Sequence, residues 1–207
     1  FASSEHPSTE LHPRLVVKYT MPVTSSCVKL SSAEGKDTQV WDYDPTGTLD
    51  RGTDRSDIVI YEWTKDRAET SKYGMLDFDF STIPANSEIT EATLSLYHDA
   101  TSVDPGHSQL SGSNEAVIQR ITSDWSETVS WDAIPSSVET NQTTIPASTS
   151  ETQDYEIDLV NLTQDVINDK SNSFGFIIKM VETSHYRSLV FASGEHADAD
   201  LHPTLNV

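Results

Sequence analysis

Carboxylates are the commonest side chains in this sequence that could do chemistry, and one stretch concentrates them. Residues 42–57 form a loop-like segment rich in Asp, Gly and Thr, and Asp37 lies just before it. Carboxylate oxygens are the hard ligands that Ca²⁺ prefers, although no EF-hand spacing is present. We interpret these residues first as solvated loop acids, and a calcium site is the alternative. Its candidate ligands are Asp37, Asp42, Asp44, Asp50, Asp54 and Asp57.

The other patterns that could support catalysis or metal binding are weak. His196 and His202 are mirrored by His6 and His12, but their separation suits neither one helix face nor one strand face, and a metal site needs convergent imidazoles. No carboxylate pair is marked out as a general acid and base, and the chain has no Ser-His-Asp order or Gly-rich phosphate loop. We therefore predict a protein that is not an enzyme.

Aromatic residues near loops offer a binding surface instead. Glycan binding needs exposed rings that stack on sugar faces, whereas a tryptophan in a β-sandwich most often packs in the core. We interpret Trp125 and Trp131 as residues that pack in the core or anchor a loop. The candidates for glycan stacking are Trp41, Tyr43 and Trp63, and Tyr61, Tyr73 and Tyr186 also lie near loops.

The overall charge excludes some classes of partner. Thirteen Lys and Arg residues against thirty-three Asp and Glu residues give a net charge of -20, which opposes phosphate backbones and anionic lipid. We therefore predict no nucleic-acid partner, and repulsion of acidic polysaccharides unless a cation bridges them. No apolar stretch reaches eighteen residues, so we also expect no insertion into a membrane.

Polar composition favours an exported protein. The single cysteine, Cys27, excludes an intrachain disulfide and leaves the redox compartment open. The stretch 136–152 is rich in Ser and Thr, and Asn141 and Asn161 begin Asn-X-Thr sequons, which also occur by accident. We predict a secreted, extracellular or cell-surface protein, with Asn141 and Asn161 as glycosylation candidates.

Period-two alternation dominates the chain and predicts the strands that position these residues. In residues 74–80, Leu76, Phe78 and Phe80 point one way while Asp77 and Asp79 point the other, which is typical of a half-buried strand. Tyr155, Ile157 and Leu159 alternate in the same manner. Further strands are predicted at 12–19, 38–41, 58–63, 89–97, 116–121, 174–181, 188–192 and 203–207.

The remaining segments complete an all-β prediction. Leu162, Val166 and Ile167 follow Asn161 at helical spacing, so we predict one short helix capped by Asn161. Long polar loops are expected at 99–114 and 135–153. Many short strands and one minor helix indicate an all-β, jelly-roll type β-sandwich with an extended N-terminal strand.

An internal repeat joins the two ends of the chain. Residues 1–17 repeat residues 191–207 at a constant offset of 190, with ten of seventeen positions identical. A copy this short cannot fold alone, so we interpret it as the tail of another unit. We expect two parts: residues 1–20 as a strand or arm that pairs with a neighbouring unit, and residues 21–207 as the β-sandwich domain.

Several segments together resemble a known family. They read Gly-Lys-Asp-Thr-Gln-Val-Trp at 35–41, Gly-Met-Leu-Asp-Phe-Asp-Phe-Ser-Thr-Ile-Pro at 74–84, Ile-Thr-Glu-Ala-Thr-Leu-Ser-Leu-Tyr at 89–97, Trp-Ser-Glu-Thr-Val-Ser-Trp-Asp-Ala-Ile-Pro at 125–135 and Phe-Ala-Ser-Gly-Glu at 191–195, with Pro-Thr-Leu at 203–205. This succession resembles the DNRLRE domain family and is similar to carbohydrate-binding modules of family 96. The resemblance implies a secreted or cell-surface jelly-roll module without catalysis, and polysaccharide binding is known for some members. The family does not require an extra closing strand at the front.

Two functions follow from these features. Our preferred prediction is a structural subunit of an extracellular filament, whose units join head to tail as a homopolymer or as tandem repeats. The alternative is a carbohydrate-binding module of a secreted or cell-surface protein, with polysaccharide as its partner. The predicted assembly strand uses Leu11, Pro13, Leu15, Val16, Val17 and Tyr19.

Overall fold

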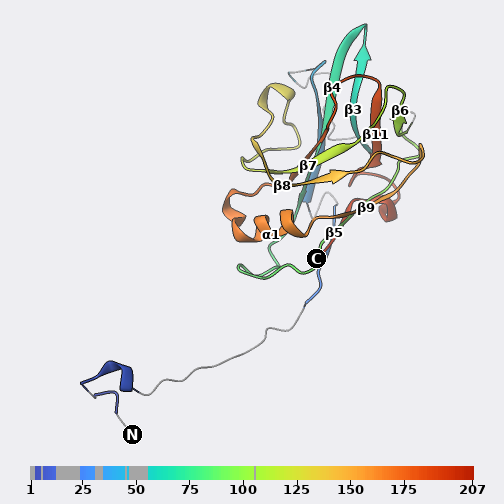
Figure 1. The fold of residues 1–207 in the computed structure, drawn as a ribbon. Helices are drawn as coiled ribbons and strands as arrows, with labels where there is room; N and C mark the ends of the chain where they lie inside the picture. Colours follow the sequence, from blue (N-terminus) through green and yellow to red (C-terminus); the bar gives the residue numbers. More distant parts are fainter. Residues whose placement is uncertain are drawn as a thin grey trace.

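Two antiparallel β-sheets pack face to face and enclose one main hydrophobic core (Figure 1). This computed structural model describes residues 3–5, 7–12, 24–30, 35–44, 46, 56–104 and 106–207. Side chains from both sheets, such as Leu94 and Leu205 from one and Ile118 and Ile178 from the other, meet in that core. The predicted all-β sandwich with one short α-helix is therefore confirmed.

The smaller sheet joins the first and last described strands. Its order is β1-β12-β5-β9, so the closing strand β12 lies between β1 and β5. Leu205 of β12 is the cross-strand partner of both Val28 and Leu94, and all three side chains are buried. The strands are β1 (Cys27–Lys29), β12 (Thr204–Asn206), β5 (Thr93–Leu96) and β9 (Tyr155–Asp158).

The larger sheet contains most of the described strands. Its order is β6-β11-β3-β4-β10-β7-β8, and β2 pairs with β4 beside this path. Because β4 pairs with β2 and also with β3, segments far apart in sequence share one surface. The strands are β2 (Gly35–Trp41), β3 (Asp57–Lys65), β4 (Ala68–Phe78), β6 (Ser108–Gln109), β7 (Ala116–Ile121), β8 (Ser137–Ile145), β10 (Phe176–Met180) and β11 (Arg187–Ala192).

Alternation in the sequence produces the buried face of these strands. Leu76 and Phe78 of β4 are 0% and 3% exposed, and Tyr155 and Ile157 of β9 are buried as predicted. Each such side chain contributes roughly 1.5–3 kcal/mol through burial. The core is therefore built from the positions that the period-two pattern selects.

The α-helix is correctly predicted, but its cap is not. α1 spans Val160–Asn168 and buries Leu162, Val166 and Ile167 against the core. It begins before Asn161, because Asp158 at the end of β9 accepts a hydrogen bond from the Val160 N–H at 2.9 Å. The short 3-10 helices are η1 (Thr9–Leu11), η2 (Trp131–Ala133), η3 (Lys170–Asn172) and η4 (Ala199–Leu201). Among the described residues, none of these helices has the length and apolar character needed to cross a membrane.

Several element boundaries differ from the sequence predictions, and three of the differences are instructive. The predicted loop 135–153 contains β8, whose Thr143 and Thr144 pair with Ile118 and Val117 of β7. The other predicted loop contains β6, and β2 begins at Gly35 rather than at residue 38. The loop prediction relied on polarity, but threonine is β-branched and suits a strand with a solvent-facing side at a sheet edge.

The repeated segment has the same local backbone at both ends of the chain. Ser8 and His12 flank η1 with φ/ψ of -94/111 and -60/143, and their counterparts Asp198 and His202 flank η4 with -92/104 and -61/140. In Figure 1, η1 lies apart from the two sheets, whereas η4 lies against them. Of the predicted assembly strand, Leu11 ends η1, and Pro13, Leu15, Val16, Val17 and Tyr19 lie outside the described residues.

Candidate functional site

Five aromatic rings form one continuous surface, which we call the aromatic strip: Trp41, Tyr43, Tyr61, Trp63 and Tyr186. Trp41 and Tyr43 stack with ring centroids 4.9 Å apart and planes 29° apart. At the other end, Trp63 and Tyr186 meet edge to face at 4.9 Å. Tyr61 lies between these pairs, because Trp41 and Trp63 both pack against the cluster that it forms with Val59 and Val190.

Strand pairing explains why these rings share a face. Lys72 of β4 is the cross-strand partner of Trp41 in β2 and of Tyr61 in β3, so all three side chains point the same way. The Lys72 ammonium lies 5.0 Å from the Trp41 ring centroid and 5.1 Å from that of Tyr61. This cation attracts the faces of both rings and joins the two strands.

Alternation in β3 supplies the centre of the strip. Ile58 and Ile60 enter the main core, while Val59, Tyr61 and Trp63 belong to the other face. One face of β3 therefore packs in the main core, and its opposite face forms the centre of the strip. Backbone pairing with β4 and β11 holds β3 in place.

Hydrogen bonds fix the orientation of two rings. The Trp41 Nε1–H donates to Thr70 Oγ1 at 2.7 Å, and Thr70 donates in turn to the Asp42 carboxylate. The Tyr43 hydroxyl donates to the Asp66 carboxylate. That hydrogen bond, together with the negative charge of Asp66, raises the pKa of Tyr43. Rings held in this way need little ordering when they bind a ligand.

Packing partners separate the strip from the other aromatic residues, since Tyr73 and Trp131 are half-buried as well. Trp41, Tyr43 and Trp63 are half-buried and Tyr186 is 36% exposed, so each offers part of a ring to solvent. Tyr73 instead packs on Trp131 at 4.7 Å in a second cluster. Trp125 is buried and its Nε1–H donates to the Phe174 carbonyl at 2.7 Å, in keeping with an anchoring role.

The family model of carbohydrate-binding module family 96 matches residues 30–207, which is most of the chain. This chain belongs to carbohydrate-binding module family 96. A search among curated proteins found no match. The matched range contains the whole aromatic strip and excludes the N-terminal copy of the repeat.

Acidic groups border the strip of this family 96 module. Glu62 alternates with Tyr61 and Trp63 in β3 and so points away from the strip. It is 4% exposed, and burial raises its pKa to about 7, with the nearby charge of Asp42 acting in the same direction. Asp42 and Asp66 accept hydrogen bonds at the strip itself. Their carboxylates can accept hydrogen bonds from sugar hydroxyls, and they disfavour an anionic ligand.

Among the described residues of the family 96 module, the predicted calcium ligands do not come together. Asp50 and Asp54 lie outside the described residues, and no arrangement of three His, Cys, Asp or Glu side chains suited to a metal occurs within the described ranges. Asp42 accepts from Thr70, and Asp57 accepts from Ser102 Oγ at 2.5 Å. A calcium site therefore stays a prediction, which a fall in melting temperature on adding chelator would support and an unchanged melt would contradict.

Asp37 is the most perturbed of these carboxylates. It is 2% exposed, lies beside Glu195, and accepts a hydrogen bond from the Gly194 N–H at 2.6 Å. Burial, with the neighbouring charge of Glu195, raises the pKa of Asp37 to about 8. It is therefore protonated in the folded protein at neutral pH.

The two C-terminal histidines anchor the chain end. His202 is buried, with Nδ1 2.9 Å from the Leu30 carbonyl and Nε2 2.7 Å from the His196 carbonyl. His196 lies 3.4 Å from the buried Asp99 carboxylate. Both rings therefore contact groups of the chain itself.

Both sequon asparagines are exposed in the structure. Asn141 lies in β8, and its Nδ2–H donates to Asp165 of α1 at 2.9 Å. Asn161 lies in the first turn of α1. Their glycosylation stays a prediction.

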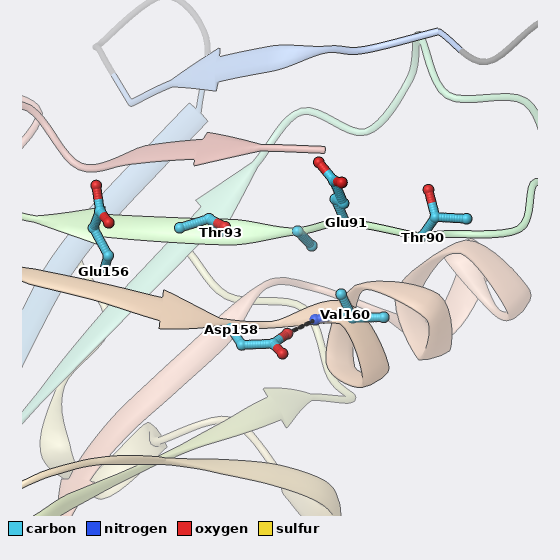
Figure 2. A pocket seen from close by; sticks show the side chains of 7 residues that line it. Thr90, Glu91, Thr93, Glu156, Asp158 and Val160 are labelled. Atoms are coloured by element: carbon cyan, nitrogen blue, oxygen red, sulfur yellow. Dashed lines mark hydrogen bonds between the residues drawn. The ribbon is translucent and has the colours of Figure 1, made fainter.

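Sequence reasoning did not find one polar depression of the family 96 module, at β5, β9 and the start of α1 (Figure 2). The carboxylates of Glu91, Glu156 and Asp158 dominate its lining, and Asp158 also accepts the α1 hydrogen bond described above. No aromatic residue lines it. It lacks the ring faces on which sugars stack, so the aromatic strip is the better candidate site.

Proposed function

We propose that this protein is a carbohydrate-binding module of a secreted or cell-surface protein, and that the aromatic strip is its binding surface. The observation that carries this proposal is the joining of five rings into one partly exposed strip on a family 96 fold. The module holds polysaccharide and does not cleave it. The finer resemblance to the DNRLRE family stays a prediction.

The strip suits an extended sugar chain in three ways. Trp41, Tyr43 and Trp63 present ring faces or edges for apolar contact with pyranose rings. Asp42 and Asp66 supply hydrogen-bond acceptors at one end of the strip. The net charge of -20 favours a neutral polysaccharide, and an acidic one would bind only with a bridging cation or at high salt.

Affinity electrophoresis tests this proposal. Gels containing xylan, mannan, a soluble cellulose derivative or alginate, the last with and without Ca²⁺, would retard the protein if it binds. We expect Trp63→Ala to weaken retardation tenfold or more, because an aromatic anchor of an interface contributes about 2 kcal/mol. The matched control is Trp131→Ala, a half-buried tryptophan outside the strip, and it should bind nearly as well as the wild type. Equal losses in both variants would contradict the proposal.

A second function, as a structural unit joined head to tail, is favoured by the repeated segment. Its two copies share ten residues and nearly identical backbone angles around η1 and η4. We propose that the N-terminal copy joins units into a filament. Electron microscopy and sedimentation of the full chain and of a chain lacking residues 1–17 test this. Fibres or head-to-tail oligomers formed only by the full chain would support it, and two equally stable monomers would contradict it.

A further inference from the structure

We propose that residues 1–17 are a second closing segment, which completes the β-sandwich of a second copy of this chain by entering between that copy's β1 and β5. The arm would take the place that residues 191–207 hold in this structure. The inference rests on the second proposed function and names the site and the residues that would carry it.

The closing segment in the structure is held by buried side chains. Phe191 is 0% exposed and lies against the rings of His107 and Tyr155. Leu205 is 0% exposed and faces Val28 and Leu94 on the two flanking strands. We call the place that residues 191–207 fill the slot. A segment that binds there must supply an aromatic residue and a leucine fourteen residues apart.

Polar contacts also hold the closing segment. His202 faces the carbonyls of Leu30 and His196, and the ring of His196 faces the buried carboxylate of Asp99. The Ser193 N–H donates to the Ser56 carbonyl at 2.9 Å. The contacts with Leu30, Asp99 and Ser56 fix the register of the segment, because they join it to three separate parts of the chain.

The arm keeps the anchors and changes mainly the exposed positions. Four of its seven differences fall at residues 197–200 and a fifth at Asn206, all of them exposed. These five changes should leave binding to the slot intact, because the positions face solvent. The retained anchors are Phe1, Ser3, His6, His12 and Leu15, which correspond to Phe191, Ser193, His196, His202 and Leu205.

Two differences touch the slot and make the arm the weaker occupant. Ser4 corresponds to Gly194, where an added Cβ would lie 3.1 Å from Asp37 Oδ2, a tight but adjustable contact. Arg14 corresponds to Thr204, whose cross-strand partner is Lys29, so like charges would face each other. We therefore expect the arm of another copy to displace an intact closing segment in only a fraction of the molecules.

The described part of the arm already has the bound shape. Ser8 and His12 adopt the backbone angles of Asp198 and His202 around the same kind of 3-10 turn. A segment ordered in this way loses less conformational freedom on binding. The match in backbone angles is a separate observation from the match in the residues that fill the slot.

The native Cys27 provides a reporter for the test. In the smaller sheet Cys27 is the cross-strand partner of Asn206, whose counterpart in the arm is Val16. Facing residues of an antiparallel pair have Cα atoms about 4.5–5.5 Å apart, which suits a disulfide. The exposed Cys27 thiol should therefore join a cysteine at position 16 of a second copy.

The first experiment oxidises full-length Val16→Cys with oxidised glutathione and maps the products. We expect covalent dimers and higher oligomers whose peptides join position 16 to Cys27 at several times the yield of Thr9→Cys, a control from the same arm whose counterpart Ala199 is exposed. Yields that match the control would overturn the proposal. A disulfide within one chain would do the same, because the arm would then occupy the slot of its own chain.

A second variant tests the fit of the arm without any assembly. The full chain is made with arm residues at the seven differing positions, as Gly194→Ser, Ala197→Pro, Asp198→Ser, Ala199→Thr, Asp200→Glu, Thr204→Arg and Asn206→Val. We expect cooperative unfolding with a melting temperature lowered by several degrees. An unfolded product would overturn the proposal, since the arm sequence would not fit the slot. Fibres that form without the disulfide between position 16 and Cys27 would support head-to-tail assembly but contradict the proposed entry of the arm between β1 and β5.

Discussion

At the scale of single residues, Trp41 shows how the strip is prepared for binding. Its indole N–H is bonded to Thr70, one face stacks on Tyr43, and the Lys72 ammonium lies near its ring. Thr70 and Lys72 belong to β4, whereas Tyr43 follows the end of β2. The ring is therefore held in place before a ligand arrives, and loosening any one contact should weaken binding without removing the ring.

Thr70→Val should separate ring orientation from ring presence. Valine keeps the shape of threonine but removes the acceptor for Trp41 and the donor to Asp42, and Thr70 is 2% exposed. We expect a loss of about 1–3 kcal/mol in stability, since two polar groups lose their partner, and several-fold weaker polysaccharide retardation. Thermal melts and affinity electrophoresis measure both. Unchanged retardation would show that this hydrogen bond does not position the ring.

Asp37 should make stability depend on pH. Because its pKa is raised from 3.8 to about 8 in the folded protein, its contribution is complete below pH 4 and is lost as the pH rises toward 8. Asp37→Asn, whose amide oxygen can still accept from Gly194, should lose less stability than the wild type between pH 5 and pH 8, by an amount on the order of a few kcal/mol. Urea unfolding at the two pH values tests this. Parallel losses in both proteins would contradict the assignment.

At the scale of elements, alternation predicts some strands well and polarity misleads for others. β4 and β9 follow the pattern in Leu76, Phe78, Tyr155 and Ile157, because one face of each strand is committed to the core. The sequence pattern does not predict β8, because the middle residues of this strand are exposed and polar. The helix α1 is found from its apolar spacing, whereas its start depends on Asp158, a residue of the preceding strand.

Gly175 should be indispensable where the chain enters β10. Its φ is +87, and an added Cβ would collide with the Leu76 carbonyl oxygen of β4. Gly175→Ala should cost about 3 kcal/mol or more, from backbone strain and the displacement of β4. Gly112→Ala is the matched control, since its φ of +113 is also positive but nothing lies within 4 Å. Similar midpoints of denaturant unfolding for the two variants would contradict this account.

At the scale of the whole molecule, the sandwich brings together residues that the sequence cannot relate. Trp41, Tyr43 and Trp63 are identifiable as stacking candidates, because they are aromatic and near loops. Their union in one strip requires β2 and β3 both to pair with β4, and Tyr186 joins through the start of β11. Pairing between distant strands leaves no local signal, so the candidates are predictable and their arrangement is not.

The net charge of -20 should govern the choice among polysaccharides. Repulsion between exposed charges weakens as salt shortens the screening length from about 30 Å at 0.01 M to about 8 Å at 0.15 M. We therefore expect binding of alginate to strengthen with ionic strength or with Ca²⁺, and binding of a neutral xylan or mannan to change little. Microscale thermophoresis over a salt series measures this. Alginate binding that weakens with salt would contradict it.

The most direct test of the central claim follows the four tryptophan indole N–H signals by NMR while xylohexaose, mannohexaose or cellohexaose is added. If the aromatic strip binds sugar, the signals of Trp41 and Trp63 will shift with a bound oligosaccharide, while those of Trp125, bonded to Phe174, and Trp131, packed on Tyr73, stay in place. Binding that shifts Trp125 or Trp131 and leaves Trp41 and Trp63 unmoved would place the site elsewhere and contradict the account.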